Sequence, residues 1–176
     1  NLLIIQTAFI GDVVLTTPLL QAAREQLGAT YVAAVVRPDA VGVLYNNPAV
    51  DEIIPFDKKG VDRGLKGLIR LGGRLREKHF EAALMPHRSL RSALLAWLAR
   101  IPVRTGFDTS SGRWLLTHRV PYQAVHEVER NLSLLSPLTS APLSFKPTLY
   151  PDDTDHTAVD DLLKRHNVRP DEILFG

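Results

Sequence analysis

One carboxylate near the N-terminus stands out as a group that could do chemistry, in the stretch NLLIIQTAFIGDVVLTTP. Gly11 and Asp12 follow the apolar run Leu2–Ile5, which is typical of a strand buried on both faces. Pro18 then indicates the beginning of a regular helix. Loops between a strand and a helix are where ligands bind in α/β sheets, so Asp12 is a candidate general base that could take a proton from a ligand.

The same loop argues against a bound nucleotide phosphate. A dinucleotide fingerprint needs three spaced glycines, but the segment Gln6–Asp12 contains only Gly11. A P-loop needs a Lys followed by Ser or Thr, which is also missing, and the carboxylate of Asp12 would repel a pyrophosphate. These residues therefore disfavour a nicotinamide or nucleotide enzyme and favour a neutral or hydroxyl-bearing ligand.

A structural role is the alternative for these residues. Asp is among the best N-cap residues, so Asp12 could begin a helix rather than face a ligand. Because Pro18 cannot donate a hydrogen bond inside a helix, the regular helix is expected to start near Thr17. Thr16 and Thr17 are then cap residues first and ligand contacts second. The residues alone leave open whether Asp12 is a base or a cap.

A second polar cluster follows the apolar run Ala82–Met85, again at the carboxyl end of an expected strand. Ser89 is placed to cap the next helix, and His87 follows the strand directly. Arg88 and Arg91 suit an anionic ligand such as an acidic sugar or a phosphate. The alternative is that both arginines are solvated charges at the start of a helix.

Strands that alternate with helices predict an α/β fold, a Rossmann-like parallel sheet with helices on both faces. We expect Trp97 and Trp114 to pack in the core or at a hinge. The expected strands are Leu2–Ile5, Tyr31–Val36, Glu52–Phe56, Ala82–Met85, Val103–Phe107 and Val120–Tyr122. Five helices are expected. The first ends at about Leu27, before Gly28, and the others are Leu65–Leu75, Leu90–Leu98, Val125–Leu135 and Thr157–His166.

The composition fits one sizeable core and excludes several classes of site. Of the 176 residues, 45% are hydrophobic, enough to bury one core, and no cysteine is present for a disulfide or a thiolate metal site. The sequence offers no metal-ligand cluster, no apolar run of membrane-spanning length and no secretory signal. Residues 58–119 hold 14 of the 21 Lys and Arg but only four acids, which indicates an anionic partner.

The segment VDRGLKGLIRLGGRLREKH carries the densest basic face. It could rest on anionic lipid. The alternative, which we favour for its leucines, is an ordinary helix that packs them on the sheet and leaves the cations in water. The cations on this face are Arg63, Lys66, Arg70, Arg74 and Lys78.

The composition changes beyond Ser136, where prolines become frequent. We expect residues 1–140 to form one Rossmann-like domain. Residues 141–176 are expected to be a linker, a helix and, in DEILFG, the first strand of a second domain. On this interpretation the chain is the first part of a longer protein.

Three blocks resemble glycosyltransferase family 9, the ADP-heptose:lipopolysaccharide heptosyltransferases. They are IGDVVLTTPLLQAAR, FEAALMPHRSLRSALLAWLARIPVRTGF and HEVERNLSLL, in the family's order and covering most of residues 2–135. The second block is most similar to the heptosyltransferase II branch, although Glu81 stands where an Asp is commoner.

The resemblance implies the N-terminal, acceptor-binding half of a GT-B fold, with the donor site in a C-terminal domain that this chain would lack. It implies a cytoplasmic enzyme, peripheral at the inner membrane, that transfers a sugar with inversion from ADP-heptose to the lipopolysaccharide inner core. The base would be Asp12, no cofactor or metal would be needed, and the chain alone would be inactive. No nucleic acid partner is expected, and the alternative is a nonenzymatic sugar- or anion-binding module. The expected acceptor-binding residues are Gly11, Thr16, Thr17, His87, Arg88, Ser89 and Arg91.

Overall fold

A six-stranded parallel sheet forms the centre of the computed structural model, which describes residues 1–141, 144–168 and 172. The strand order is β3-β2-β1-β4-β5-β6, and every neighbouring pair is parallel. This confirms the predicted Rossmann-like α/β fold. The strands are β1 (Leu2–Gln6), β2 (Val32–Val36), β3 (Glu52–Pro55), β4 (Ala82–Met85), β5 (Val103–Phe107) and β6 (His118–Val120).

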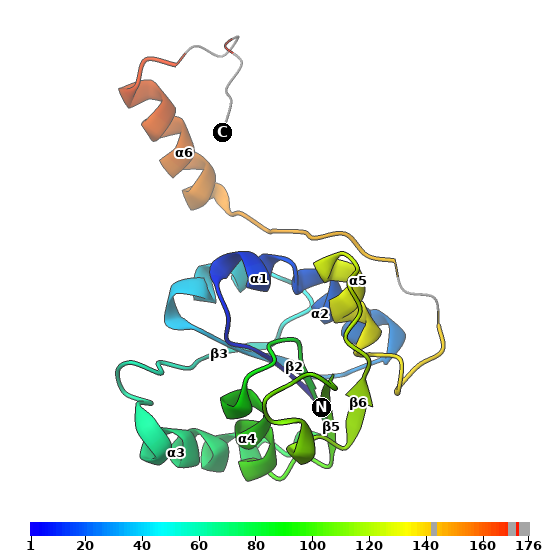
Figure 1. The fold of residues 1–176 in the computed structure, drawn as a ribbon. Helices are drawn as coiled ribbons and strands as arrows, with labels where there is room; N and C mark the ends of the chain where they lie inside the picture. Colours follow the sequence, from blue (N-terminus) through cyan, green and yellow to red (C-terminus); the bar gives the residue numbers. More distant parts are fainter. Residues whose placement is uncertain (142–143, 169–171, 173–176) are drawn as a thin grey trace.

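Helices cover both faces of the sheet (Figure 1). One layer contains α1 (Ile10–Val14), α2 (Thr17–Gln26), α5 (Glu127–Ser133) and the 3₁₀ helix η1 (Pro38–Leu44). The opposite layer contains α3 (Gly64–Arg76), α4 (Leu90–Leu98) and the 3₁₀ helix η2 (Arg113–Leu115). A further helix, α6 (Asp153–Arg165), lies apart from the sheet.

The central strand β1 explains why the core has two halves. Its side chains alternate between the faces, so Leu2 and Ile4 join the core under α2 and α5. Leu3 and Ile5 join the core under α3 and α4. All four are at most 4% exposed, which is why this strand reads as one continuous apolar run.

The strand order also decides where a ligand can bind. The chain winds outward from β1 to β3 in one direction and from β4 to β6 in the other. Such a reversal leaves a crevice at the carboxyl ends of the two central strands. The loops after β1 and β4, which hold both predicted clusters, therefore lie next to each other.

Two helices, α1 and α2, follow β1, and the break between them lies just before the predicted start of the regular helix. Phe9 is the N-cap of the short helix α1, and Asp12 is its third helical residue, so the interpretation of Asp12 as N-cap is wrong. A second helix, α2, has Thr16 as its N-cap and Pro18 at its second position. The break has the expected cause, because Pro18 has no N–H to continue the first helix. The helix ends as predicted, just before Gly28 with a φ of 60°.

Other boundaries shift for local reasons. The last strand is His118–Val120 rather than Val120–Tyr122. Helix α6 begins at Asp153, earlier than predicted, because Asp152 and Asp155 form a reciprocal capping box. The strand expected in DEILFG falls almost entirely outside the described residues.

Packing differs from the sequence expectation at two places. Trp97 and Trp114 are 50% and 62% exposed, which rules out the core, whereas packing at a hinge stays a prediction. On α3 the face that packs on the sheet is made by Leu68, Leu71 and Leu75. Leu65 and Ile69, which the apolar spacing also assigned to that face, are 62% and 52% exposed.

The described residues after 140 touch the sheet domain at several points, and Phe145 packs against the core under α2 and α5. None of the described side chains of α6 is buried. The segment before it is held by Thr148, whose backbone N–H donates to Thr17 Oγ1 at 3.1 Å, and by the amide of Asn46, which donates to the Tyr150 carbonyl at 3.4 Å. A domain boundary near residue 140 stays a prediction.

Candidate active site

A cavity of about 470 Å³ lies at the carboxyl edge of the sheet, at the reversal between β1 and β4. Its wall combines the loops after β1, β4, β5 and β6 with the start of α5. The lining residues are Gln6, Ala8, Asp12, Pro86, His87, Arg88, Thr109, Ser111, Tyr122 and Glu127. Three of the eight predicted site residues, Asp12, His87 and Arg88, are thus brought together although up to 76 positions separate them.

Asp12 is held with one carboxylate oxygen engaged. Its Oδ2 accepts a hydrogen bond from the backbone N–H of Phe9 at 2.9 Å, which fixes the first turn of α1. Its Oδ1 accepts no hydrogen bond from the described part of the chain. Asp12 is only partly buried and lines the cavity. The side chain therefore stabilises a helix terminus and still offers an oxygen to a ligand.

The structure does not bring Thr16 and Thr17 to the cavity. Both are at most 3% exposed, and their hydroxyls are used inside the protein. Thr16 Oγ1 donates to the Asp12 carbonyl at 2.7 Å and accepts from Gln6 Nε2 at 3.0 Å. Thr17 Oγ1 donates to the Val14 carbonyl at 2.8 Å. Thr16 thus positions the backbone of Asp12 and makes no contact with the cavity.

Gly11 is the second residue of α1 and is exposed beside Asp12. A Cβ atom built there meets no atom within 4 Å, and its φ is not positive. Nothing in the described protein therefore requires glycine at this position, which leaves the close approach of a ligand as its predicted role.

Replacing Gly11 with Ala is expected to show whether a ligand approaches this residue closely. Because alanine loses less backbone entropy on folding, we expect the free energy of unfolding to rise by about 0.5 kcal/mol. If a ligand contacts this residue, the added methyl group should lower the affinity for that ligand. Thermal unfolding and a binding titration measure the two effects, and raised stability with unchanged affinity would remove Gly11 from the site.

His87 shares a buried polar network with the loop after β1. Its Nδ1 lies 3.0 Å from Thr7 Oγ1, which is 3.4 Å from Ser92 Oγ. Burial, together with the nearby Lys58 ammonium, lowers the pKa of His87 below its ordinary value, although Asp12 opposes this shift. His87 is therefore a neutral hydrogen-bonding group at neutral pH and contributes no fixed positive charge.

Lys58 is a cation that the sequence did not single out. It follows β3, and its Nζ donates to the Thr7 carbonyl at 2.9 Å, so it ties the loop after β3 to the loop after β1. No carboxylate in the described part of the chain pairs with it. Burial, with the nearby Arg91 and Arg37, lowers the pKa of Lys58 to about 8. An anion bound beside Lys58 would reduce the repulsion between its ammonium and the guanidinium groups of Arg37 and Arg91.

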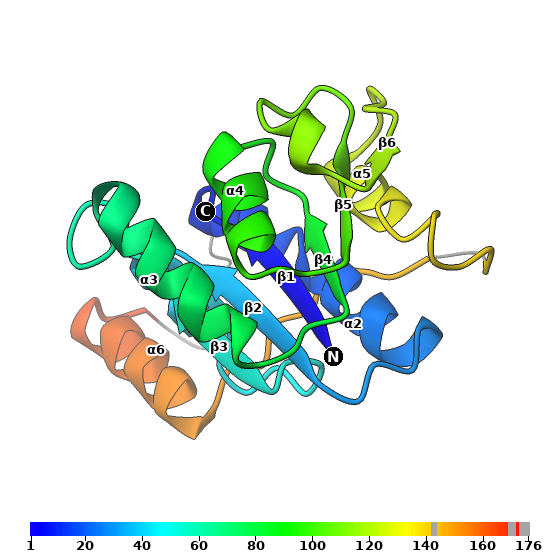
Figure 2. The same ribbon diagram turned by 90° about the horizontal axis from the view of Figure 1, so that it is seen from below.

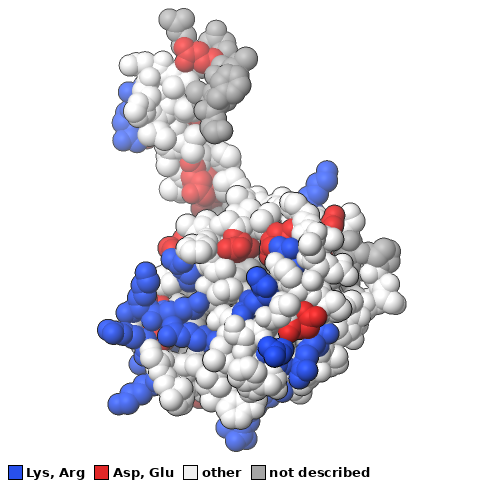
Figure 3. Space-filling view, viewed as in Figure 1, with Lys and Arg blue, Asp and Glu red and all other residues white. Residues whose placement is uncertain are grey.

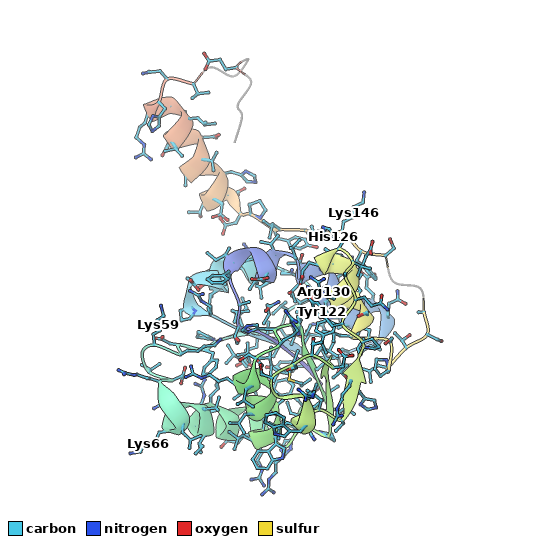
Figure 4. All side chains as sticks on the ribbon, in the orientation of Figure 1. Lys59, Lys66, Tyr122, His126, Arg130 and Lys146 are labelled. Atoms are coloured by element: carbon cyan, nitrogen blue, oxygen red, sulfur yellow. The ribbon has the colours of Figure 1, made fainter. Side chains whose placement is uncertain are left out.

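Two arginines stack on Tyr122, which lines the cavity. The guanidinium of Arg88 lies 4.1 Å from the ring centroid, and that of Arg130 lies 4.6 Å from it. Arg130 also forms an ion pair with Glu127. The side chain of Arg88 makes, among the described residues, a single long hydrogen bond of 3.4 Å to Thr109 Oγ1. Figure 4 shows Tyr122 and Arg130 beside each other at the start of α5. Arg88 is thus positioned by stacking and keeps its charge available.

The side chains of Ser89 and Arg91 do not line the cavity. Ser89 is the N-cap of α4 and accepts the backbone N–H of Arg91 at 3.2 Å, as the sequence predicts. The side chain of Arg91 is exposed and does not line the cavity; its charge acts on Lys58. Neither residue joins Asp12 in the cavity.

The assembled cavity offers one partly free carboxylate, a neutral imidazole and a guanidinium that forms no ion pair with the described residues. These groups can accept a proton from a hydroxyl, hydrogen-bond to it and bind an anion on the same ligand. Among the described residues no group of three or more His, Cys, Asp or Glu could hold a metal ion. His126, which begins α5, instead caps that helix through Nδ1, which accepts from Val128 N at 3.3 Å.

Comparison with known proteins gives a family. Residues 68–169 match the family model described as glycosyltransferase family 9 (heptosyltransferase), which is more than half of the chain. The chain belongs to glycosyltransferase family 9. This family 9 chain is 28% identical over 122 residues to the lipopolysaccharide core heptosyltransferase OpsX of Haemophilus influenzae. The match covers 68% of this chain but only 34% of OpsX.

Solved structures of family 9 glycosyltransferases share the fold of this chain over about half of their own length. A family 9 glycosyltransferase from Veillonella parvula superposes with a TM-score of 0.85 at 22% identity, over 98% of this chain and 51% of that one. The ADP-heptose lipopolysaccharide heptosyltransferase II of Escherichia coli gives 0.70 at 22% identity, over 97% and 51%. The chain therefore spans about half the length of these enzymes. No helix in the described ranges is long and apolar enough to cross a bilayer.

Proposed function

We propose that this chain is the acceptor-binding half of a heptosyltransferase-type enzyme and that Asp12 is its general base. The observation that carries the proposal is the position of Asp12. Its carboxylate lines the switch-point cavity, and its Oδ1 accepts no hydrogen bond from the residues that the structure describes. A carboxylate in that place can take the proton of a sugar hydroxyl.

The reaction would proceed in one displacement. The acceptor hydroxyl attacks the anomeric carbon of the donor sugar and gives its proton to Asp12 Oδ1. The bond from that carbon to the phosphate oxygen breaks, and the nucleoside diphosphate leaves with the electron pair. Attack opposite the leaving group inverts the configuration, which is why one carboxylate is sufficient and no covalent intermediate forms.

The other cavity residues would orient an anionic acceptor. Arg88 can pair with a carboxylate or phosphate of the acceptor, since its stacking on Tyr122 leaves its hydrogen-bond donors largely unused. His87, kept neutral by burial, can form a hydrogen bond with a sugar hydroxyl. The exposed glycine at position 11 allows the sugar to approach α1 closely.

The donor is proposed to be ADP-heptose, and the acceptor a hydroxyl of the lipopolysaccharide inner core. The names of the relatives support both, and the half-length match supports a donor site in a C-terminal domain. We also propose that the enzyme works in the cytoplasm at the face of the inner membrane. The segment 141–176 would then be the passage into the donor domain, and the isolated chain would be inactive.

The test is a transfer assay on the complete polypeptide that carries this chain. ADP-heptose and other nucleotide-sugars are offered with a truncated lipopolysaccharide core, and both nucleoside diphosphate release and the mass of the acceptor are followed. We expect acceptor-dependent release and an acceptor heavier by one heptose. Release that does not depend on the acceptor, or acceptor binding without any transfer, would contradict the proposal and favour a binding module.

A further inference from the structure

Gln6 is the one buried polar side chain among the described residues that line the cavity. It is the last residue of β1, which lies in the middle of the sheet between β2 and β4 (Figure 2). The four residues before it in this strand are Leu and Ile, and Gln6 itself is only 2% exposed. A buried amide lowers the stability of the fold unless its polar atoms are hydrogen-bonded. Both ends of the Gln6 amide therefore need partners.

The hydroxyl of Thr16 fixes which end of this amide faces it. Thr16 Oγ1 has one hydrogen, which it donates to the Asp12 carbonyl at 2.7 Å. Toward Gln6 the same oxygen can only accept, so it faces the amide nitrogen, and Gln6 Nε2 lies 3.0 Å away. A flipped amide would place two acceptors against each other. The orientation therefore leaves Gln6 Oε1 as the end of the amide that Thr16 does not use.

The amide oxygen of Gln6 has no partner within the described ranges. Oε1 is buried, and no N–H or O–H of the described residues donates to it. Native proteins satisfy most buried acceptors, because an acceptor that is left without a donor is destabilising. Gln6 lines the cavity together with Asp12. A donor on a ligand in that cavity is therefore a suitable partner for Oε1.

The chemistry of this oxygen suits a hydroxyl rather than an anion. An amide oxygen accepts hydrogen bonds and carries no formal charge, so it matches an O–H donor and repels the oxygens of a carboxylate or phosphate. Arg88, an exposed guanidinium in the same cavity wall, has the opposite preference. Figure 3 shows Lys, Arg, Asp and Glu on the surface of the sheet domain, whereas Gln6 lies beneath that surface. An anionic sugar would therefore hold its charged group outward and an uncharged hydroxyl toward Gln6.

We propose that Gln6 determines acceptor specificity by accepting, through Oε1, a hydrogen bond from one hydroxyl of the acceptor sugar. This hydroxyl is not the one that reacts, because the reacting hydroxyl gives its proton to Asp12. The inference rests on the proposed function, since it requires that the cavity holds the acceptor. Sugars that lack this hydroxyl, or carry an anionic group in its place, bind more weakly because Oε1 is then buried without a donor. Gln6 takes no proton in the reaction, so it acts on acceptor binding rather than on the chemical step.

The test compares the complete polypeptide with its Gln6→Met variant on a set of acceptors that each lack one hydroxyl. Methionine is similar to glutamine in length and shape but has no amide oxygen. We expect Gln6→Met to raise the KM for the parent acceptor roughly 10-fold, while kcat changes by less than about twofold. For one deoxy acceptor the KM should not rise further, because the hydroxyl that pairs with Oε1 is already missing. The Tm should stay unchanged or rise, since the variant removes a buried acceptor that no described residue satisfies.

Thr105→Val is the matched control. Thr105 Oγ1 is also buried without a partner among the described residues, but it lies on β5 and does not line the cavity. This variant should leave the KM of every acceptor unchanged. An equal rise in KM for all acceptors in Gln6→Met, or a fall in kcat like that expected for Asp12→Asn, would overturn the inference and make Gln6 a support for Thr16 and Asp12. If the parent enzyme transfers sugar to none of the acceptors, the proposed function fails, and this inference fails with it.

Discussion

Replacing Asp12 with Asn is expected to slow glycosyl transfer by roughly 100- to 10,000-fold while leaving the fold unchanged. The amide oxygen of Asn can still accept the N–H of Phe9, which now bonds to Asp12 Oδ2 at 2.9 Å. The amide cannot take a proton from the acceptor hydroxyl. The variant therefore separates the helix-terminal role of this side chain from its proposed role as a base, which the sequence alone left undecided.

The measurement is the rate of nucleoside diphosphate release at saturating acceptor, together with thermal unfolding of the same protein. Asp39→Asn is the isosteric control, because Asp39 pairs with Arg37 and does not line the cavity. Unchanged transfer by Asp12→Asn would remove Asp12 as the base. A larger loss in Glu127→Gln would move the role to the other carboxylate of the cavity.

Replacing Phe107 with Ala should lower the free energy of unfolding by about 3–5 kcal/mol. The ring is 1% exposed at the end of β5 and forms an edge-to-face contact with Tyr122, with 5.3 Å between the ring centroids. Its removal leaves a cavity in the core and takes away the support of the ring on which Arg88 stacks. We therefore expect weaker acceptor binding as well as lower stability.

Denaturant unfolding checks the stability of this variant, and a titration with acceptor checks the affinity. Phe107→Leu keeps most of the buried volume, so it should lower the free energy of unfolding by only about 1 kcal/mol. Any loss of acceptor affinity in this variant then reports on the missing contact between the two rings. Leu65→Ala, at an exposed position, should change stability by less than about 0.5 kcal/mol. A loss for Phe107→Ala as small as that of Leu65→Ala would show that the core tolerates the cavity.

The sequence could predict features that depend on neighbouring residues. The apolar runs of β1 and β4, the cap formed by Ser89 and the stop at Gly28 are local signals, and the structure has all of them. The alternation of strands and helices was sufficient for the fold class, because βαβ connections leave few arrangements open. The position of Asp12 shortly after the first strand followed from the same order.

Contacts between distant segments were beyond the sequence. Nothing near Thr16 indicates that Gln6 would use its hydroxyl, and nothing near Lys58 indicates its bond to the Thr7 carbonyl. The exposure of Trp97 depends on how α4 lies against α3 and the sheet. A large apolar side chain predicts burial on average, but the packing of the surrounding helices decides the individual case.

The sequence by itself determined a parallel α/β domain, a carboxylate after its first strand and a concentration of positive charge in its middle third. Only the tertiary structure decided that Asp12, His87 and Arg88 share one cavity, and that Glu127 and Tyr122 complete its wall. It also decided that Leu65 and Ile69 of α3 are exposed to solvent. The physical reason is that local preferences act over a few residues, whereas the strand order brings together loops that the chain keeps far apart.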